Sequence, residues 1–279
     1  MITKCKNKVH KKYAVVVPCY NEEKRFPFAK FLEFAKANKD VLICLVNDGS
    51  KDKTLSVLKG LNYESDENVC VYNLEKNSGK SEAVRQGMLY VYENFEAELI
   101  GFLDADLATT LEEWLEMARY KETKPKYGVI VGSRIARLGA NIVRDDTRSI
   151  VSLLVKKFIK IILKTSFQDT QCGAKIFARN IIPHLFSKAF RTPWLFDVEI
   201  FLRLQKKFGS TTLSQGVLEF PLMEWTEIGG SKLKLKETIK IPLQLLQLHY
   251  IYNLKSGFKA EKAYVLNNKS KAIPNVVNA

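Results

Sequence analysis

Three runs of apolar residues, each followed by a polar segment, dominate the first 110 positions of the chain. Residues 13–17, 41–46 and 99–103 consist almost entirely of aliphatic and aromatic side chains. Runs of this length without polar alternation are typical of strands buried on both faces, as in parallel sheets. Because helix-length segments separate the runs, the pattern predicts an α/β domain with a mostly parallel sheet.

The polar segments that end these runs carry the candidate chemistry. They read Pro18-Cys-Tyr-Asn-Glu22, Asn47-Asp-Gly-Ser-Lys-Asp-Lys-Thr54 and Asp104-Ala-Asp106. In open α/β sheets, ligands collect at the carboxyl ends of the strands. Asp104 and Asp106 can both face one hard cation, and Mg²⁺ or Mn²⁺ would share it with a substrate diphosphate. A solvated aspartate pair that opens a turn is the alternative interpretation.

Asp48 and Lys80 are further candidates for binding a nucleotide. A turn at residues 48–50 explains Gly49 but does not require Asp48, whose carboxylate can accept hydrogen bonds from a base or a ribose. Lys80 stands at the start of a predicted helix whose apolar stripe runs from Ala83 to Val91. A lysine at a helix start is well placed to meet a phosphate.

Three arginines are candidates for a second phosphate. Arg134 follows another short apolar run, and Arg144 and Arg148 flank a pair of aspartates. Planar guanidinium groups bind phosphates in bidentate fashion. For Arg144, a surface salt bridge to Asp145 or Asp146 is a serious alternative.

The net charge of +14 requires an explanation. No nucleic-acid-binding module accompanies it, so we expect no nucleic-acid partner. An anionic membrane surface is the favoured partner, and a lysine-rich surface that only maintains solubility is the alternative. Residues 149–164 and 233–252 favour the membrane, since lysines and broad apolar faces suit interfacial helices. A core helix with one wet stripe is an equal alternative for residues 149–164.

The cysteines and the hydropathy bear on the compartment. The five cysteines are scattered and fit no disulfide framework or zinc spacing, which points to a reducing compartment. Residues 241–252, the apolar part of the second segment, are too short and too polar to span a bilayer. We therefore expect a cytoplasmic protein that attaches peripherally to a membrane.

Taken together, the motifs resemble those of the family 2 glycosyltransferases of the GT-A fold. The first set is Pro18-Cys-Tyr-Asn-Glu22, Asn47-Asp-Gly-Ser-Lys-Asp-Lys-Thr54, Asn77-Ser-Gly-Lys80 with Ala83-Val-Arg85-Gln-Gly87, and Asp104-Ala-Asp106. A later set resembles the branch of dolichyl-phosphate β-glucosyltransferases and polyprenyl-phosphate glycosyltransferases: Gly132-Ser-Arg134, Asp169-Thr-Gln-Cys-Gly173 and Trp194-Leu-Phe-Asp-Val-Glu199.

The resemblance covers residues 13–225 and implies a domain organisation. A GT-A-type, Rossmann-like sheet flanked by helices would occupy residues 13–230. A basic arm, residues 1–12, would precede it, and an amphipathic interfacial helix with a polar tail, residues 231–279, would follow.

The resemblance also implies roles for individual residues. The nucleotide-sugar would be bound by Pro18, Tyr20, Glu22, Asp48, Lys80 and Asp104. The metal ion would be held by Asp104 and Asp106, and the acceptor phosphate by Arg134, Arg144 and Arg148. The catalytic set would comprise Asp106, Asp197, Asp169 and Arg134, with Gln171 and Trp194 lining the acceptor or sugar side.

The implied reaction is inverting, metal-dependent transfer of a hexose from a nucleoside-diphosphate sugar to a polyprenyl or dolichyl phosphate. Asp104-Ala-Asp-Leu-Ala-Thr109 resembles the glucosyl branch, which favours UDP-glucose. A phosphate acceptor is already ionised near neutral pH, because its second pKa is about 6, and so needs no general base. A hydroxyl acceptor on a surface glycan is the alternative, with Asp169, Asp197 or Glu199 as the base. A catalytically silent protein that binds only membranes or a partner is a more remote one.

Overall fold

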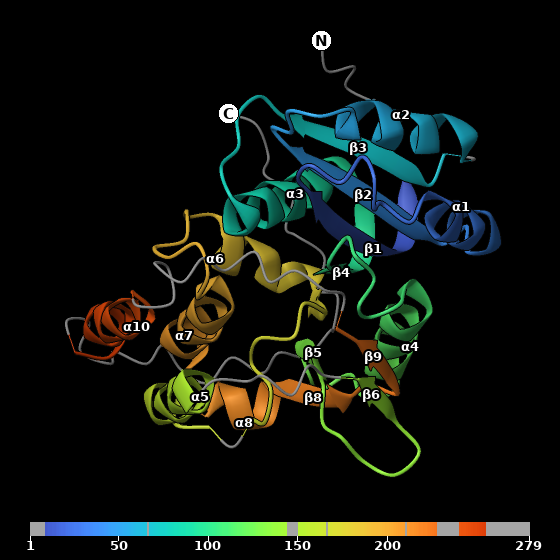
Figure 1. Cartoon of the computed structure of the whole chain (residues 1–279). Coiled ribbons are helices and arrows are strands. Elements are labelled where there is room, and N and C mark those ends of the chain that lie inside the picture. The colour runs from blue at the N-terminus through green and yellow to red at the C-terminus, as the bar shows by residue number, and fades with distance from the viewer. Residues whose placement is uncertain are drawn as a thin grey trace, which may run out of the picture.

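A seven-stranded sheet forms the centre of the protein. The computed structural model describes residues 9–65, 67–143, 150–165, 167–209, 211–227 and 240–254. The strands of the sheet lie in the order β3-β2-β1-β4-β7-β5-β8 (Figure 1). Their bounds are β1 His10–Cys19, β2 Val41–Asp48, β3 Val69–Leu74, β4 Glu96–Phe102, β5 Val129–Ser133, β7 Lys175–Ala178 and β8 Val217–Pro221.

The sheet is mostly parallel, as the apolar runs predicted. Neighbouring strands from β3 to β4 are parallel, and so are β5 and β8. Only β7 within this sheet runs antiparallel to its neighbours, β4 and β5. All eight residues of β2 are buried, which explains its unbroken apolar run.

Helices cover both faces of the sheet. The first face packs against α1 Phe28–Ala37, α2 Thr54–Glu64 and α4 Leu111–Glu122. The second packs against α3 Lys80–Asn94, α5 Ile150–Leu163, α6 Ile182–Phe186, α7 Phe196–Phe208 and α8 Thr212–Gly216. The three-residue turn η1 Arg179–Ile181 leads from β7 into α6. A small parallel ribbon of β6 Asn141–Val143 and β9 Glu224–Thr226 lies beside α4 (Figure 1).

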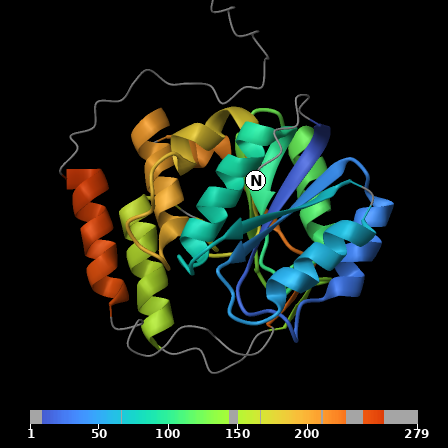
Figure 2. The ribbon, with the colours of Figure 1, turned by 90° about the horizontal axis from the view of Figure 1, so that it is seen from above.

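The last described helix lies at the outside of this second layer. It comprises α10 Ile241–His249 and the π-helical segment η2 Tyr250–Leu254. Figure 2 shows α10 beside α5, at the outer edge of the molecule. Within the described part of the chain, no helix is long and apolar enough to cross a membrane. Residues 1–8, 228–239 and 255–279 lie outside the described part, and so do most residues of the predicted arm and C-terminal region.

Helix α3 packs closely against the sheet, and one glycine permits the approach. The predicted apolar stripe of α3 is confirmed, since Ala83, Val84, Gly87, Met88 and Val91 are all buried. A Cβ atom at Gly87 would lie 2.5 Å from a methyl carbon of a β1 valine and 2.6 Å from one of a β2 valine. These distances are far inside van der Waals contact, so the position tolerates no side chain without a shift of the helix.

We predict opposite effects for two glycine-to-alanine substitutions. Gly87→Ala should lower the free energy of unfolding by about 1–3 kcal/mol through overpacking. Gly60→Ala, in α2, is the matched control, because its added Cβ would meet only a Phe28 ring carbon at 3.8 Å. It should raise the free energy of unfolding by about 0.5–1 kcal/mol through helix propensity. Urea unfolding of both variants measures the difference; equal effects would contradict the packing described.

Candidate active site

The polar segments identified in the sequence meet at one edge of the sheet. The carboxyl ends of β1, β2 and β4 are adjacent, since Cys19 pairs with Asn47 and Val16 pairs with Phe102. Strand β7 runs in the opposite direction and therefore begins at this edge, where Lys175 pairs with Phe102. The edge is where ligands bind in open α/β sheets.

Asp48 fixes the loop that leads into α3. Its buried carboxylate accepts hydrogen bonds from the backbone N–H of Ser78 at 2.7 Å, from that of Gly79 at 2.9 Å, and from Asn77 Nδ2 at 3.0 Å. Burial raises the pKa of Asp48, although the two backbone hydrogen bonds act in the opposite direction. These contacts use three of the roughly four acceptor positions of a carboxylate. The predicted contact to a base or ribose would use the remaining one.

Lys80 lies among three aspartates. It follows Gly79, which adopts a positive φ of 87°, and is the first residue of α3. Lys80 Nζ lies 2.5 Å from Asp104 Oδ1, and both side chains are about one third exposed. Burial alone would lower the pKa of Lys80, but the charges of Asp104, Asp197 and Asp106 together raise it.

Asp104 and Asp106 fit a divalent cation shared with a substrate. Asp104 Oδ1 is shielded from solvent and, apart from its ion pair with Lys80, has no hydrogen-bond partner within the described residues. Burial and the charge of Asp104 raise the pKa of Asp106, whose Oδ1 accepts one hydrogen bond from the backbone of Ala108 at 3.1 Å. The described residues contain no cluster of three or more His, Cys, Asp or Glu side chains suited to a metal. Two carboxylates, with phosphate oxygens and water as further ligands, match the way Mg²⁺ is usually bound.

Gly173 allows the carboxylate of Asp104 to approach the 169–173 loop. A Cβ atom at Gly173 would lie 2.2 Å from Asp104 Oδ2. The glycine in the predicted motif therefore has a steric reason: any side chain there would displace Asp104.

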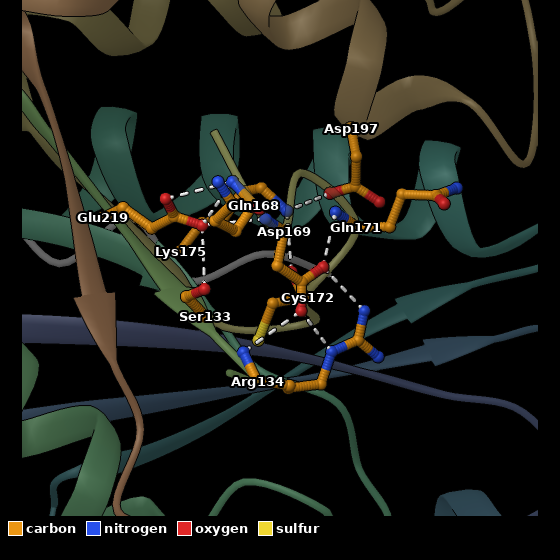
Figure 3. Close-up of polar contacts among 9 residues, drawn as sticks. All are labelled: Ser133, Arg134, Gln168, Asp169, Gln171, Cys172, Lys175, Asp197 and Glu219. Carbon is orange, nitrogen blue, oxygen red and sulfur yellow. Dashed lines mark hydrogen bonds and ion pairs between the residues drawn. The ribbon is translucent and has the colours of Figure 1, made fainter. Parts of the chain in front are cut away.

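Arg134 and Asp169 form a bidentate ion pair, shown in Figure 3. Arg134 Nε donates to Asp169 Oδ2 at 2.6 Å, Nη2 donates to Oδ1 at 2.8 Å, and the backbone N–H of Arg134 donates to Oδ2 at 3.1 Å. The guanidinium group also lies 5.1 Å from the ring centre of Trp225. Three of its five N–H donors remain for another ligand.

The ion pair decides the protonation of Asp169. Burial would raise the pKa of Asp169, but the Arg134 hydrogen bonds and charge outweigh it and lower the pKa to about 2. A carboxylate with this pKa is a weak proton acceptor at neutral pH. The geometry therefore favours a role for Asp169 in holding Arg134.

Asp197 is held by a lysine that the sequence did not single out. Lys175, fully buried on β7, donates to Asp197 Oδ1 at 2.6 Å and to the carbonyl of Cys172 at 2.7 Å (Figure 3). Asp197 stands in the first turn of α7, so this contact joins α7 to the 169–173 loop. A lysine inside an apolar strand is the one signal in the sequence that could have marked it, since a buried ammonium needs partners.

Glu219 is a second residue missed in the sequence. Its carboxylate, on β8, accepts hydrogen bonds from Ser133 Oγ at 2.8 Å and from the backbone N–H groups of Gln168 and Asp169 (Figure 3). These contacts hold the start of the loop that carries Asp169. No local pattern marks Glu219, because its partners are about 50 and 86 residues away.

Two acidic candidates are engaged in structural contacts. Glu22 is buried and receives two hydrogen bonds from Arg25, while its backbone N–H donates to Thr54 Oγ1 at 2.7 Å. Glu199, a candidate base for a hydroxyl acceptor, is fully buried and accepts from Arg203 and Tyr252 at 2.8 and 2.7 Å. Glu22 therefore stabilises the segment after β1, and Glu199 joins α7 to η2.

The remaining candidates have simpler positions. Pro18 is paired within β1, and Tyr20 directly follows that strand. Gln171 is half-buried beside Asp169, to which its backbone N–H donates at 3.2 Å, and Trp194 is half-buried just before α7. Arg144 and Arg148 lie outside the described residues.

The mostly parallel sheet with these carboxylates at its carboxyl edge agrees with the GT-A-type fold that the motifs predicted. Residues 14–186 match the model of glycosyl transferase family 2. The chain belongs to this family.

Relatives with a named activity cover most of the chain. A dolichyl-phosphate beta-glucosyltransferase of Trichomonas vaginalis is 32% identical over 247 residues, 84% of this chain and 72% of the relative. Proteins of the same name from Drosophila melanogaster and Homo sapiens are 35% and 30% identical, over 79% and 80% of this chain and 68% and 70% of those relatives.

Solved structures share the fold at low identity. Mannosyl-3-phosphoglycerate synthase from Rubrobacter xylanophilus aligns with a TM-score of 0.66 at 14% identity, over 91% of this chain and 78% of that one. Glucosyl-3-phosphoglycerate synthase from Mycobacterium tuberculosis, solved with Mn²⁺, UDP-glucose and phosphoglyceric acid, aligns with a TM-score of 0.63 at 14% identity, over 87% and 79% of the two chains. These structures confirm the predicted fold class.

We predict that Asp169→Asn reduces stability in a pH-dependent way. A carboxylate whose pKa is lowered to about 2 stabilises the folded state above its unfolded pKa, and this contribution is lost as the pH falls from about 4 towards 2. Asp169→Asn should therefore cost about 2–3 kcal/mol at pH 7 and about half of that at pH 3.

Urea unfolding at pH 7, 4 and 3 measures this difference. Asp40→Asn removes the same charge from an exposed position and serves as the control, with an expected change within about 0.5 kcal/mol. A cost for Asp169→Asn that stays constant from pH 7 to pH 3 would contradict the ion-pair account.

Proposed function

We propose that the protein transfers glucose, with inversion, from UDP-glucose to a dolichyl or related polyprenyl phosphate. The observation that carries the proposal is the convergence of two kinds of group at one edge. Asp104 and Asp106 suit a cation–diphosphate, and Arg134 presents unused guanidinium donors. The names of the relatives support both the sugar and the acceptor.

The donor side is supported by charge. Asp104 and Asp106 would hold Mg²⁺ or Mn²⁺, which when bound neutralises negative charge on the leaving diphosphate. Lys80 is close enough to this pair to contact the same diphosphate. Asp48 holds the loop before Lys80 and so positions it.

The acceptor side is supported by the state of the carboxylates. Asp169 is bound bidentately by Arg134, and Asp197 Oδ1 is bound by Lys175. A hydroxyl acceptor would need one of these groups as a base, whereas a phosphate monoester is already ionised at neutral pH. The engaged carboxylates therefore favour a phosphate as the nucleophile, with Arg134 orienting it.

A peripheral membrane site, on the cytoplasmic face, is part of the proposal. Adjacent helices α5 and α10, with η2, expose large apolar side chains at 51–71%: Phe158, Ile161, Leu243, Leu246, Tyr250 and Leu254. We call these six residues the apolar surface. Lys157, Lys164 and Lys240 are exposed on the same helices or next to them, which suits an anionic lipid surface.

Helix α5, which carries Phe158 and Ile161 of the apolar surface, also contacts the acceptor side of the site. Lys160, on α5, donates to Gln168 Oε1 at 3.1 Å, and Gln168 precedes Asp169. A lipid phosphate at the membrane surface beside α5 would therefore be close to the loop whose Asp169 binds Arg134. This proximity supports a membrane-embedded acceptor.

We predict that Arg134→Lys separates acceptor use from donor binding. The lysine keeps the charge but loses the planar fork, so kcat/KM for a polyprenyl phosphate should fall by at least about tenfold. The Kd for UDP with Mn²⁺ should stay within about twofold of the wild type. Arg137→Lys, an exposed arginine three residues later, is the control and should leave both values unchanged.

The assay follows lipid-linked hexose by mass spectrometry, with UDP-glucose, UDP-galactose, UDP-N-acetylglucosamine or GDP-mannose as donor. UDP-glucose is the expected donor. Equal losses of acceptor use and donor binding in Arg134→Lys would contradict the acceptor role. Metal-dependent hydrolysis of a donor without any lipid product would overturn the acceptor.

We also predict that the apolar surface controls membrane binding. Leu243→Asp combined with Leu246→Asp should reduce partition into vesicles containing about 30% phosphatidylserine by at least about tenfold. Tyr63→Asp is the control, because Tyr63 is 92% exposed on α2 and lies outside this surface. Vesicle sedimentation measures binding; unchanged partition of the double variant would contradict the prediction. So would wild-type protein that forms dimers through this surface and does not bind vesicles.

A further inference from the structure

Lys80 supplies positive charge to several carboxylates at the edge. Its ammonium contacts Asp104 at 2.5 Å and also experiences the charges of Asp106 and Asp197. Asp104 and Asp106 follow β4, and Asp197 belongs to α7. One ammonium therefore compensates carboxylates from two separate parts of the fold.

A divalent cation at Asp104 and Asp106 would compete with this ammonium. The oxygen that Lys80 contacts, Asp104 Oδ1, is shielded from solvent, so a metal ion and an ammonium cannot both approach it freely. The two positive charges would also repel each other strongly at such short separation. A metal ion that binds Asp104 Oδ1 therefore requires Lys80 to release this oxygen.

The backbone of Lys80 is fixed, and its side chain can move. Asp48 anchors the preceding residues Ser78 and Gly79 through their N–H groups. The side chain is about one third exposed and carries its ammonium on a flexible four-carbon stem. A change of partner for the ammonium therefore needs only rotamer changes.

We propose that Lys80 is a placeholder for the metal ion: in the free protein its ammonium occupies the metal position at Asp104. When metal and donor bind together, the ammonium moves from Asp104 to the donor diphosphate. The diphosphate in this statement rests on the proposed function, whereas the competition with the metal does not. Bound diphosphate gives the displaced ammonium a new partner. Metal and donor then strengthen each other's binding through Lys80, in addition to their direct contact.

The placeholder role makes a prediction that other roles do not share. Removing the ammonium should strengthen metal binding in the absence of nucleotide, because the competitor is gone. A lysine that contacts only phosphate, and lies away from Asp104, would leave this affinity unchanged. A lysine that only maintains the structure would weaken it when removed.

The test is Mn²⁺ binding without nucleotide, measured by electron paramagnetic resonance of free Mn²⁺. Lys80→Met should lower the Kd for Mn²⁺ by at least about fivefold. Lys76→Met removes the same charge from an exposed position in the preceding loop and should change the Kd by less than about twofold. Lys80→Gln provides a second uncharged variant, and thermal unfolding checks that each variant is folded.

A further variant locates the effect. In the double variant Lys80→Met with Asp106→Asn, the tightened Mn²⁺ binding should disappear. Tightening that persists in this double variant would overturn the proposal, because the ion would then bind elsewhere. Unchanged or weaker Mn²⁺ binding in folded Lys80→Met and Lys80→Gln would also overturn it.

UDP binding at saturating Mn²⁺ separates the proposal from the proposed function. In Lys80→Met the Kd for UDP should rise by at least about tenfold, since the diphosphate loses the ammonium. An unchanged Kd would overturn the transfer to the diphosphate. Failure of the wild type to bind any nucleoside diphosphate would refute the proposed function, while the nucleotide-free measurement would still decide the competition at Asp104.

Discussion

Compensation of negative charge holds the edge of the sheet together. Four aspartates from different segments converge there, and a donor from another segment meets each one. The contacts are Asp48 with the 77–79 loop, Asp104 with Lys80, Asp169 with Arg134, and Asp197 with Lys175. Asp48, Asp169 and Asp197 are buried. Because a buried carboxylate without a partner is strongly destabilising, their contacts fix the loops of the site relative to one another.

The same compensation limits the chemistry of a site of this kind. Asp169 is ionised and bound bidentately by Arg134, and Asp197 Oδ1 accepts a hydrogen bond from the buried Lys175. Groups in this state orient cationic side chains well and accept protons poorly when a pKa lies near 2. An acceptor that arrives already ionised requires no such proton transfer. Anionic substrates can also replace the carboxylates as partners of the cationic side chains. Lys80 is exposed enough for this exchange, and Arg134 has unused N–H donors. Lys175 is completely buried and therefore stays with Asp197.

The sequence predicted the parts of the fold that depend on local pattern. Unbroken apolar runs marked β1, β2 and β4 because these strands are buried on both faces, and the polar residues after them marked the edge. The direction of β7 was not predicted, since its insertion between β4 and β5 depends on pairing with distant strands. Lys175 and Glu219 were missed for the same reason. Their partners lie far away in the sequence or belong to the backbone.

The most direct test of the account compares two acceptors that differ only in the phosphate. Wild-type protein is incubated with UDP-glucose, Mn²⁺ and either dolichyl phosphate or dolichol, and the lipid products are identified by mass spectrometry. We predict a glucosylated product from dolichyl phosphate and none from dolichol. Transfer to dolichol, or hydrolysis of UDP-glucose with neither lipid modified, would contradict the assignment of a phosphate acceptor.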